Sequence, residues 1–183
     1  GLTTALAAAK LGKTSVILER TQHIGGLPSN GLGATDIVTR AATTGLFREF
    51  TCRIKDYYKK KYGVTSIQYQ RCDDGFRFEP SVAEQVFTDW LGEYKDLITV
   101  LTMRQFDSSP HNIKKVDDKI VKINVLNRDK NTQEEYRGKI FIDATYEGDL
   151  AAAAGVPFRV GREGKNEFGE PGAGSDPLPA PTD

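Results

Sequence analysis

Cysteine and histidine are scarce in this 183-residue chain, which contains two of each. Cys52 and Cys72 are too few and too far apart for a disulfide framework or a cysteine-rich zinc site. His23 and His111 leave little material for a metal centre or for a triad of the serine-hydrolase kind. The sequence therefore predicts no metal site.

A net charge and a long apolar run are also missing. The 25 basic and 25 acidic side chains balance, which argues against nucleic-acid binding through a bulk basic surface. No apolar run approaches the roughly 18 residues of a membrane-spanning helix, so we expect no membrane span. The length suits one domain with a real core. Composition alone predicts a globular domain, with the cytoplasm favoured as its compartment and no oligomeric state indicated.

The ends of the chain differ from the ends of an ordinary domain. Residues 1–10 begin directly inside an alanine-rich helix, and residues 171–183 carry no packing periodicity. We therefore expect a fragment that is cut at the front and at the back. For such a fragment, the lack of a targeting signal has no meaning.

The first twenty residues predict half of a βαβ unit. Alanine and leucine favour a helix over residues 2–11, and Gly12 would end it. Residues 14–18 form a short apolar run of the kind found in buried parallel strands. A helix followed by such a strand is typical of a parallel sheet covered by helices.

Later segments predict further helices and two kinds of strand. Ser81 and Glu84 fit a capping box, in which each side chain bonds a backbone amide near the start of a helix. Alternating residues predict an antiparallel meander, whereas residues 140–142 form a second continuous apolar strand. The expected elements are an amphipathic helix over 46–58, the capped helix from 81, a strand over 97–101, meander strands over 113–116, 119–126 and 134–136, and a short helix from Asp149 or Leu150.

Gly1 and Glu19 match part of a dinucleotide-binding fingerprint. In such a unit a glycine loop places the N-terminus of the first helix, with its partial positive charge, against a pyrophosphate. An acidic residue at the end of the next strand accepts hydrogen bonds from the adenosine ribose. Gly1 stands where the third glycine of that loop would stand, and Glu19 follows 18 residues later at a strand end. The alternative is an ordinary helix–strand pair with a surface glutamate.

A double glycine, Gly25-Gly26, follows this strand after a short loop. Paired glycines let a backbone approach a ribose or a pyrophosphate without a Cβ in the way. The chain continues through a glycine-rich stretch that contains Ser29, Gly31 and Gly33 and ends at position 36. A flexible surface loop is the alternative interpretation.

The third segment follows residues 140–142 and runs Asp143-Ala144-Thr145-Tyr146-Glu147-Gly148-Asp149-Leu150. Together with the first two segments, in this order, it resembles FAD-dependent oxidoreductases of the glutathione-reductase-like class. In that class an Asp-Ala-Thr-Gly segment passes close to the dinucleotide, and a meander replaces the usual crossover helix. Tyr146 departs from the pattern because glycine is usual at its position, and a tyrosine there restricts a close approach of the backbone.

The resemblance implies a fold, a cofactor and a set of contacts. The fold would be α/β, a three-layer FAD/NAD(P)-binding, Rossmann-like domain with a central parallel sheet and an antiparallel β-meander. Residues 1–160 would form a partial FAD-binding domain without its first strand, and residues 161–183 an irregular tail leading to an absent C-terminal part. FAD would exchange hydride with a small-molecule substrate. The residues implied to contact FAD are Gly1, Glu19, Arg20, Gly25 and Gly26 at the adenosine diphosphate, Ser29, Gly31 and Gly33 toward the isoalloxazine, Val116 at the adenine, and Ala144 and Thr145 beside the dinucleotide.

Two other functions stay open at this point. One is an NAD(P)-dependent dehydrogenase on a plain Rossmann fold, and the other is a truncated, non-catalytic fragment. Cysteine redox chemistry is disfavoured because no CxxC pair exists. Cys52 is expected to be a buried small hydrophobe, and Arg71 beside Cys72 would lower the pKa of that thiol. The sequence assigns no catalytic acid or base.

Overall fold

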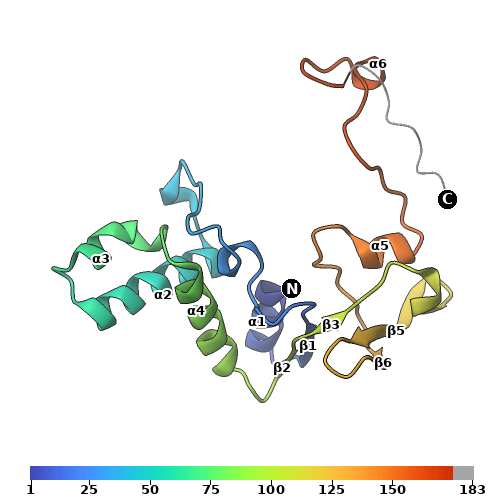
Figure 1. The fold of residues 1–183 in the computed structure, drawn as a ribbon, viewed down its shortest axis with the longest axis horizontal. Helices are drawn as coiled ribbons and strands as arrows, with labels where there is room; N and C mark the ends of the chain where they lie inside the picture. Colours follow the sequence, from blue (N-terminus) through green and yellow to red (C-terminus); the bar gives the residue numbers. More distant parts are fainter. Residues whose placement is uncertain (175–183) are drawn as a thin grey trace.

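A two-stranded parallel sheet forms the start of the fold. The computed structural model describes residues 1–174, and its elements are drawn in Figure 1. Strands β1 (Ser15–Leu18) and β2 (Ile98–Leu101) run parallel, with each residue of β1 opposite one residue of β2. Helix α1 (Leu2–Lys10) precedes β1 and packs against the sheet through Ala5, Leu6 and Ala9, which are all buried. The predicted helix–strand pair is confirmed.

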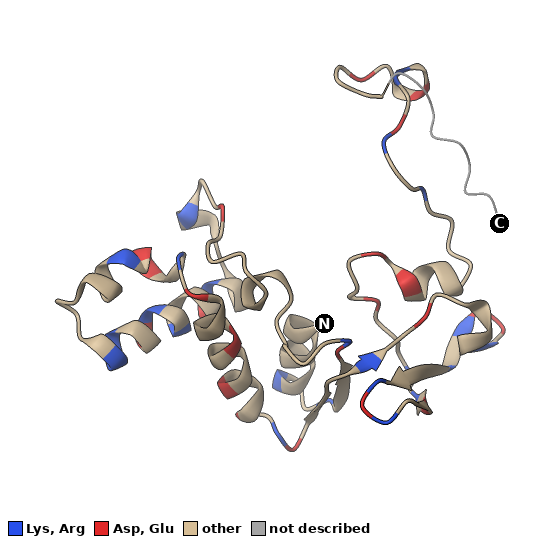
Figure 2. Ribbon diagram, viewed as in Figure 1, with Lys and Arg blue, Asp and Glu red and all other residues tan. Residues whose placement is uncertain are grey.

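Three helices make up the segment between the two parallel strands. They are α2 (Gly45–Tyr62), α3 (Ile67–Arg71) and α4 (Pro80–Gly92). The long helices α2 and α4 bury apolar faces against each other and against α1 in one continuous core. Figure 2 shows basic residues concentrated on α2 and acidic residues on α4, and Arg53 of α2 pairs with Glu93 at the end of α4. Charge thus complements the apolar contact between the helices.

An antiparallel sheet follows β2. Its central strand is β5 (Lys119–Asn127). Strands β3 (Arg104–Gln105) and β4 (Ile113–Val116) share one edge of β5, and β6 (Thr132–Arg137) pairs along the other. The expected meander is confirmed, and Asp117 and Asn131 make its turns with positive φ angles of 53° and 51°.

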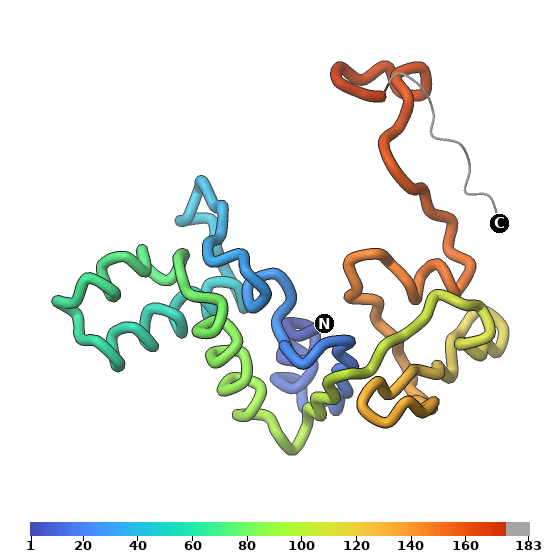
Figure 3. The backbone as a smooth tube through the Cα atoms, in the orientation of Figure 1, coloured from blue at the N-terminus to red at the C-terminus, as the bar shows by residue number. Residues whose placement is uncertain are grey.

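The chain beyond the meander forms two short helices. Helix α5 (Asp149–Ala153) begins where a short helix was expected. Figure 3 shows the chain leaving α5 and running away from both sheets to α6 (Lys165–Phe168). The predicted irregular tail over 161–183 thus contains one helical turn, and its last nine residues, 175–183, lie outside the described part of the chain.

Two local predictions are wrong. Residues 140–142 form no strand, and Ile140 and Ile142 are 80% and 56% exposed. A strand needs a neighbour to pair with its backbone, and none of the described strands pairs with this segment. The capping box at Ser81 is absent as well: α4 begins with Pro80 at its first position, and none of the described side chains caps it. Glu84 instead contacts His23, at 2.9 Å.

The architecture is α/β, with a parallel and an antiparallel sheet, as the sequence predicts. Four single-turn 3-10 helices lie in the connections, η1 (Leu27–Ser29), η2 (Arg40–Ala42), η3 (Asp73–Gly75) and η4 (Pro110–Asn112). No helix in residues 1–174 is both long enough and apolar enough to cross a membrane.

Candidate functional site

The N-terminal end of α1 lies against the loop at residues 143–148. A Cβ added to Gly1 would lie 3.3 Å from the Cβ of Ala144, so the two segments are in direct contact. The first backbone N–H groups of any helix lack acceptors within that helix. In α1 they are not capped by any side chain within the described residues. Gly1 and Ala144, predicted to share one site, are therefore neighbours beside a helix end that carries partial positive charge.

Glu19 follows β1 directly, at the carboxyl end of the parallel sheet. Its N–H donates to the carbonyl of Leu101, the last residue of β2, at 2.9 Å, and its carbonyl accepts from the N–H of Arg104, the first residue of β3, at 2.8 Å. Its Oε1 accepts hydrogen bonds from the N–H and the hydroxyl of Thr21, both at 2.9 Å. The carboxylate is half-buried and held at the strand end. A short connection joins α1 to β1, so helix and strand run in opposite directions and the start of α1 lies at this same edge.

Arg20 extends the site toward the 143–148 loop. Its Nη1 lies 4.0 Å from Oε1 of Glu147, and both side chains are largely exposed. Its carbonyl accepts a hydrogen bond from the Arg128 side chain at 3.0 Å. A pair as exposed as Arg20 and Glu147 contributes little to stability, but it shows that the end of β1 and the 143–148 loop face each other.

Gly25 and Gly26 are each required to be glycine by contacts within the protein, and the contact differs between the two positions. Gly25 and Gly26 have φ angles of 108° and 66°, which favour glycine. A Cβ on Gly25 would collide with the hydroxyl of Ser29 and lie 2.5 Å from the Phe87 ring, whereas a Cβ on Gly26 would lie 2.5 Å from the hydroxyl oxygen of Tyr146. Contacts within the protein therefore already require both glycines.

The 143–148 loop is braced by its own side chains. Asp143 accepts hydrogen bonds from the N–H and hydroxyl of Thr145, at 2.9 and 2.7 Å, and from the Ala151 N–H at 2.9 Å. Burial raises the pKa of Asp143, but these hydrogen bonds outweigh it and leave that pKa below its usual value. The Thr145 hydroxyl also accepts from the N–H groups of Gly148 and Asp149, at 2.8 and 3.2 Å. Thr145 thus shapes the loop.

Tyr146 projects from this loop to the double glycine. Its hydroxyl accepts a hydrogen bond from the Leu27 N–H at 2.6 Å, across 119 positions of sequence. The sequence predicts neither this link nor its geometry: it marks Tyr146 only as a departure from the glycine that is usual at its position. The signal in the sequence was a bulky polar side chain among small residues.

The remaining predicted residues lie at varying distances from this contact. Ser29 is buried at the end of η1, and its hydroxyl has no hydrogen-bond partner within residues 1–174. Gly33 accepts a hydrogen bond from the Phe78 N–H at 2.9 Å, and Gly31 faces open space. Val116, at the end of β4, is 53% exposed. The structure thus brings Gly1 next to Ala144 and Gly26 next to Tyr146, two contacts made by the same 143–148 loop, whereas Val116 belongs to the edge of the meander.

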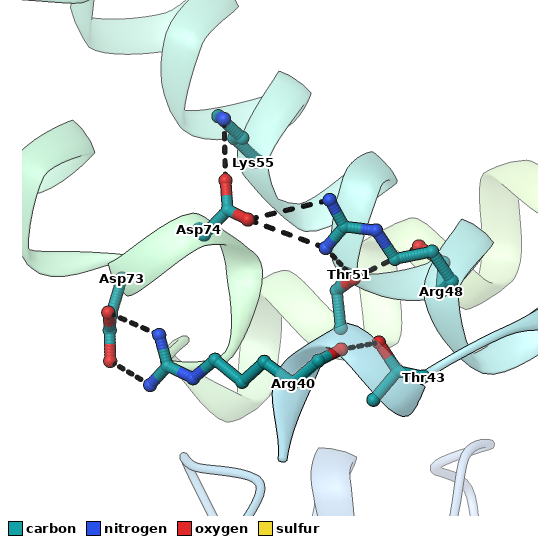
Figure 4. A network of polar contacts seen from close by, with 7 residues as sticks. All are labelled: Arg40, Thr43, Arg48, Thr51, Lys55, Asp73 and Asp74. Carbon is teal, nitrogen blue, oxygen red and sulfur yellow. Dashed lines mark hydrogen bonds and ion pairs between the residues drawn. The ribbon is translucent and has the colours of Figure 1, made fainter. Parts of the chain in front are cut away.

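A second polar cluster, which sequence reasoning missed, supports the glycine-rich stretch. In Figure 4, both Nη atoms of Arg40 donate hydrogen bonds to the carboxylate of Asp73, while Asp74 accepts from Arg48 and Lys55. These hydrogen bonds hold the pKa values of Asp73 and Asp74 below their usual range. The Asp-Asp-Gly sequence of the turn, together with the many basic residues of α2, was the signal in the sequence for this cluster.

The residues directly after this turn, Phe76 and Arg77, line part of an open hollow of about 290 Å³. The Thr35 N–H donates to the Phe76 carbonyl at 3.0 Å, which fixes the glycine-rich stretch to the residues after the turn. The guanidinium of Arg40 lies 4.6 Å from the centre of the Phe76 ring. The lining residues are Ala34, Thr35, Asp36, Ile37, Val38, Arg40, Phe76 and Arg77.

Both cysteine expectations are corrected. Cys52 is exposed, because it lies beside the apolar stripe of α2 and not within it. Cys72 is buried, and burial raises the pKa of its thiol, whereas the sequence had suggested a lowering by Arg71. Within the described residues no three His, Cys, Asp or Glu side chains gather as metal ligands would.

Comparison with known families decides the class of protein. The family model described as FAD dependent oxidoreductase matches residues 1–180. The chain belongs to this family. No curated protein and no solved structure gave a match. The predicted family and its cofactor, FAD, are confirmed, and the match favours a flavin-dependent oxidoreductase domain over the NAD(P)-dependent alternative.

Proposed function

We propose that this oxidoreductase domain holds the adenosine diphosphate part of FAD at the carboxyl edge of β1 and β2. The proposal is carried by one observation: the uncapped start of α1 and the carboxylate of Glu19 lie at this same edge, and the 143–148 loop contacts the start of α1 at Gly1 and lies beside Arg20, the residue after Glu19. A helix N-terminus favours phosphate groups, and a carboxylate accepts hydrogen bonds from ribose hydroxyls.

The donor and acceptor groups present fit such a ligand. Glu19 uses Oε1 for Thr21, and no side chain or amide in the described chain donates to its other oxygen, Oε2. The amides at the start of α1 are likewise free of side-chain caps within residues 1–174. Gly1 has no side chain and its neighbour Ala144 has only a methyl group, so there is little side-chain bulk at the start of α1. The edge therefore offers amide donors at one point and a carboxylate acceptor at another.

The stretch from Ser29 to Gly33 forms the proposed flavin side of the site. The buried Ser29 hydroxyl, unpaired in the described part of the chain, supplies a donor that a bound polar group would satisfy. The chemistry supplied by bound FAD is the acceptance or donation of hydride. The hollow beyond Gly33 would receive a small-molecule substrate, with Arg40 and Phe76 in its wall. Residues 1–160 would form the FAD-binding part, as the motifs imply.

Titration of FAD into the intact protein tests this assignment. We expect saturable binding, and Glu19→Gln should weaken it by about 10- to 100-fold, the ratio typical of a lost hydrogen bond to a charged group. Glu93→Gln is the matched control, because Glu93 pairs with Arg53 away from this edge. Equal FAD affinity in Glu19→Gln and the wild type would overturn the assignment. Absence of any FAD binding would favour the non-catalytic alternative.

A further inference from the structure

Tyr146 connects two loops that are far apart in the sequence. The hydrogen bond from the Leu27 N–H to its hydroxyl is 2.6 Å long and joins two neutral groups. Leu27 begins η1 immediately after the double glycine. The bond therefore fixes the position of the double-glycine loop relative to the 143–148 loop.

The double-glycine loop is shaped to admit this hydroxyl. A Cβ at Gly26 would lie 2.5 Å from the Tyr146 oxygen, so any residue other than glycine would push the tyrosine away. The Gly26 carbonyl in turn accepts hydrogen bonds from the Asn30 side chain at 2.8 Å and from the Ser29 N–H at 3.1 Å. Gly26 is thus a contact point for the tyrosine and an anchor for η1.

Tyr146 projects from a loop that is held by its own hydrogen bonds, and its side chain contributes little to the core. Asp143 and Thr145 brace its loop through backbone hydrogen bonds on both sides of it. The residue itself is 71% exposed, so its ring buries little apolar surface. A side chain that is exposed along its length and bonded only at its tip is suited to holding a loop in position.

We propose that Tyr146 is a positioning residue for FAD binding: its hydroxyl holds the double-glycine loop, through the Leu27 amide, in the arrangement that receives the cofactor. The proposal rests on the proposed function, because it assumes that FAD binds between these loops. Loops that are ordered before binding lose less conformational entropy when the ligand arrives. Removing the hydroxyl should therefore weaken FAD binding without unfolding the domain.

The test compares FAD dissociation constants of the intact wild-type protein, Tyr146→Phe and Tyr146→Gly, measured by flavin fluorescence. We expect about two- to tenfold weaker binding in Tyr146→Phe, the ratio that one net hydrogen bond represents. Tyr146→Gly restores the residue usual in the class and should bind no better than Tyr146→Phe. Tyr62→Phe, a partly exposed tyrosine of α2, is the matched control and should leave FAD affinity unchanged.

A second readout separates positioning from general stability. Hydrogen exchange at the Leu27 amide should accelerate in Tyr146→Phe without FAD, whereas the melting temperature should stay close to that of the wild type. Unchanged FAD affinity in Tyr146→Phe overturns this inference but leaves the proposed function standing. Tighter FAD binding in Tyr146→Phe also overturns it, since the tyrosine would then compete with the cofactor. A wild-type protein that binds no FAD overturns both.

Discussion

The helical region and the meander are held together by different forces. In the helical region, α1, α2 and α4 enclose apolar side chains, and Leu6, Ile54 and Trp90 are fully buried. In the meander, by contrast, the only apolar side chains buried within the described strands are Ile123 and Val125 of β5. Burial of apolar area supplies most of the stability in the first region, and the second must depend more on hydrogen bonds.

A network of polar side chains replaces the apolar core in the meander. Glu134 of β6 accepts hydrogen bonds from Arg104, Asn127 and Tyr136, at 3.0, 2.6 and 2.6 Å. The Arg104 guanidinium, followed by Tyr136 and Asn127, lowers the pKa of Glu134 to about 2. Asn127 is itself fully buried. The network thus connects β3, β5 and β6 around one carboxylate.

The proposed cofactor edge lies where the two regions join. Glu19 accepts from the Arg104 N–H, and Thr21 accepts from the Met103 N–H at 3.0 Å. A site at such a junction depends on both regions for its geometry. Perturbing each region separately therefore tells which one maintains the site.

The largest expected effect is that of Trp90→Ala in the helical core. Trp90 is 0% exposed, and its removal leaves a large cavity, so we expect a loss of about 3–5 kcal/mol in the free energy of unfolding. Urea denaturation followed by circular dichroism measures it. Phe168→Ala, at a residue that is 61% exposed, is the control and should change stability by no more than about 0.5 kcal/mol. A loss near the control value would mean that apolar burial does not dominate this region.

A smaller loss is expected from Gly75→Ala in the turn shown in Figure 4. Gly75 has a φ of 87°, and a Cβ there would collide with the Thr51 carbonyl, whose backbone lies in α2. A side chain at such a φ costs about 1–3 kcal/mol in either position, and in Gly75→Ala the collision with Thr51 adds to that cost. Gly63→Ala is the matched control: φ is 82°, but no atom lies within 4 Å of its Cβ. Equal melting temperatures for the two variants would show that the collision is relieved by movement of the turn.

Local patterns predicted the helices and most strands, because the information for them is contained in neighbouring residues. The apolar run at residues 140–142 has the same character as β1, yet it forms no strand, since pairing depends on a neighbour elsewhere in the chain. Glu84 has the right spacing for a cap, but its carboxylate contacts His23, 61 positions away. Residues 140–142 thus form no strand because no described strand pairs with them, and Glu84 forms no cap because it has a distant partner instead.

In the candidate site, too, motif patterns were predictable from the sequence, whereas contacts between distant segments were not. Order and spacing of the motifs predicted that Gly1 and Ala144 belong together, and the structure brings them into contact. The link from Tyr146 to Leu27 was beyond prediction, because it depends on the relative placement of two loops 119 residues apart. The two glycines were assigned to a close approach of cofactor, whereas the structure also requires them for the Phe87 and Tyr146 contacts.

The smallest expected effect is the loss of stability of the meander at low pH. It is also the sharpest test of the difference between the meander and the helical region. Glu134 has its pKa lowered from 4.5 to about 2, so its ionised form stabilises the folded state above about pH 4.5, and this contribution is lost as the pH falls toward 2. The protection factors of amides in β5 and β6, which are exchange rates corrected for the intrinsic effect of pH, should therefore fall across that window in the wild type. In Glu134→Gln these protection factors should be lower at neutral pH and should depend less on pH below 4.5. Glu93→Gln, in the helical region, is the control and should keep the wild-type acid response of β5 and β6. An identical acid response in Glu134→Gln and the wild type would show that the meander depends on its few apolar contacts and not on the carboxylate.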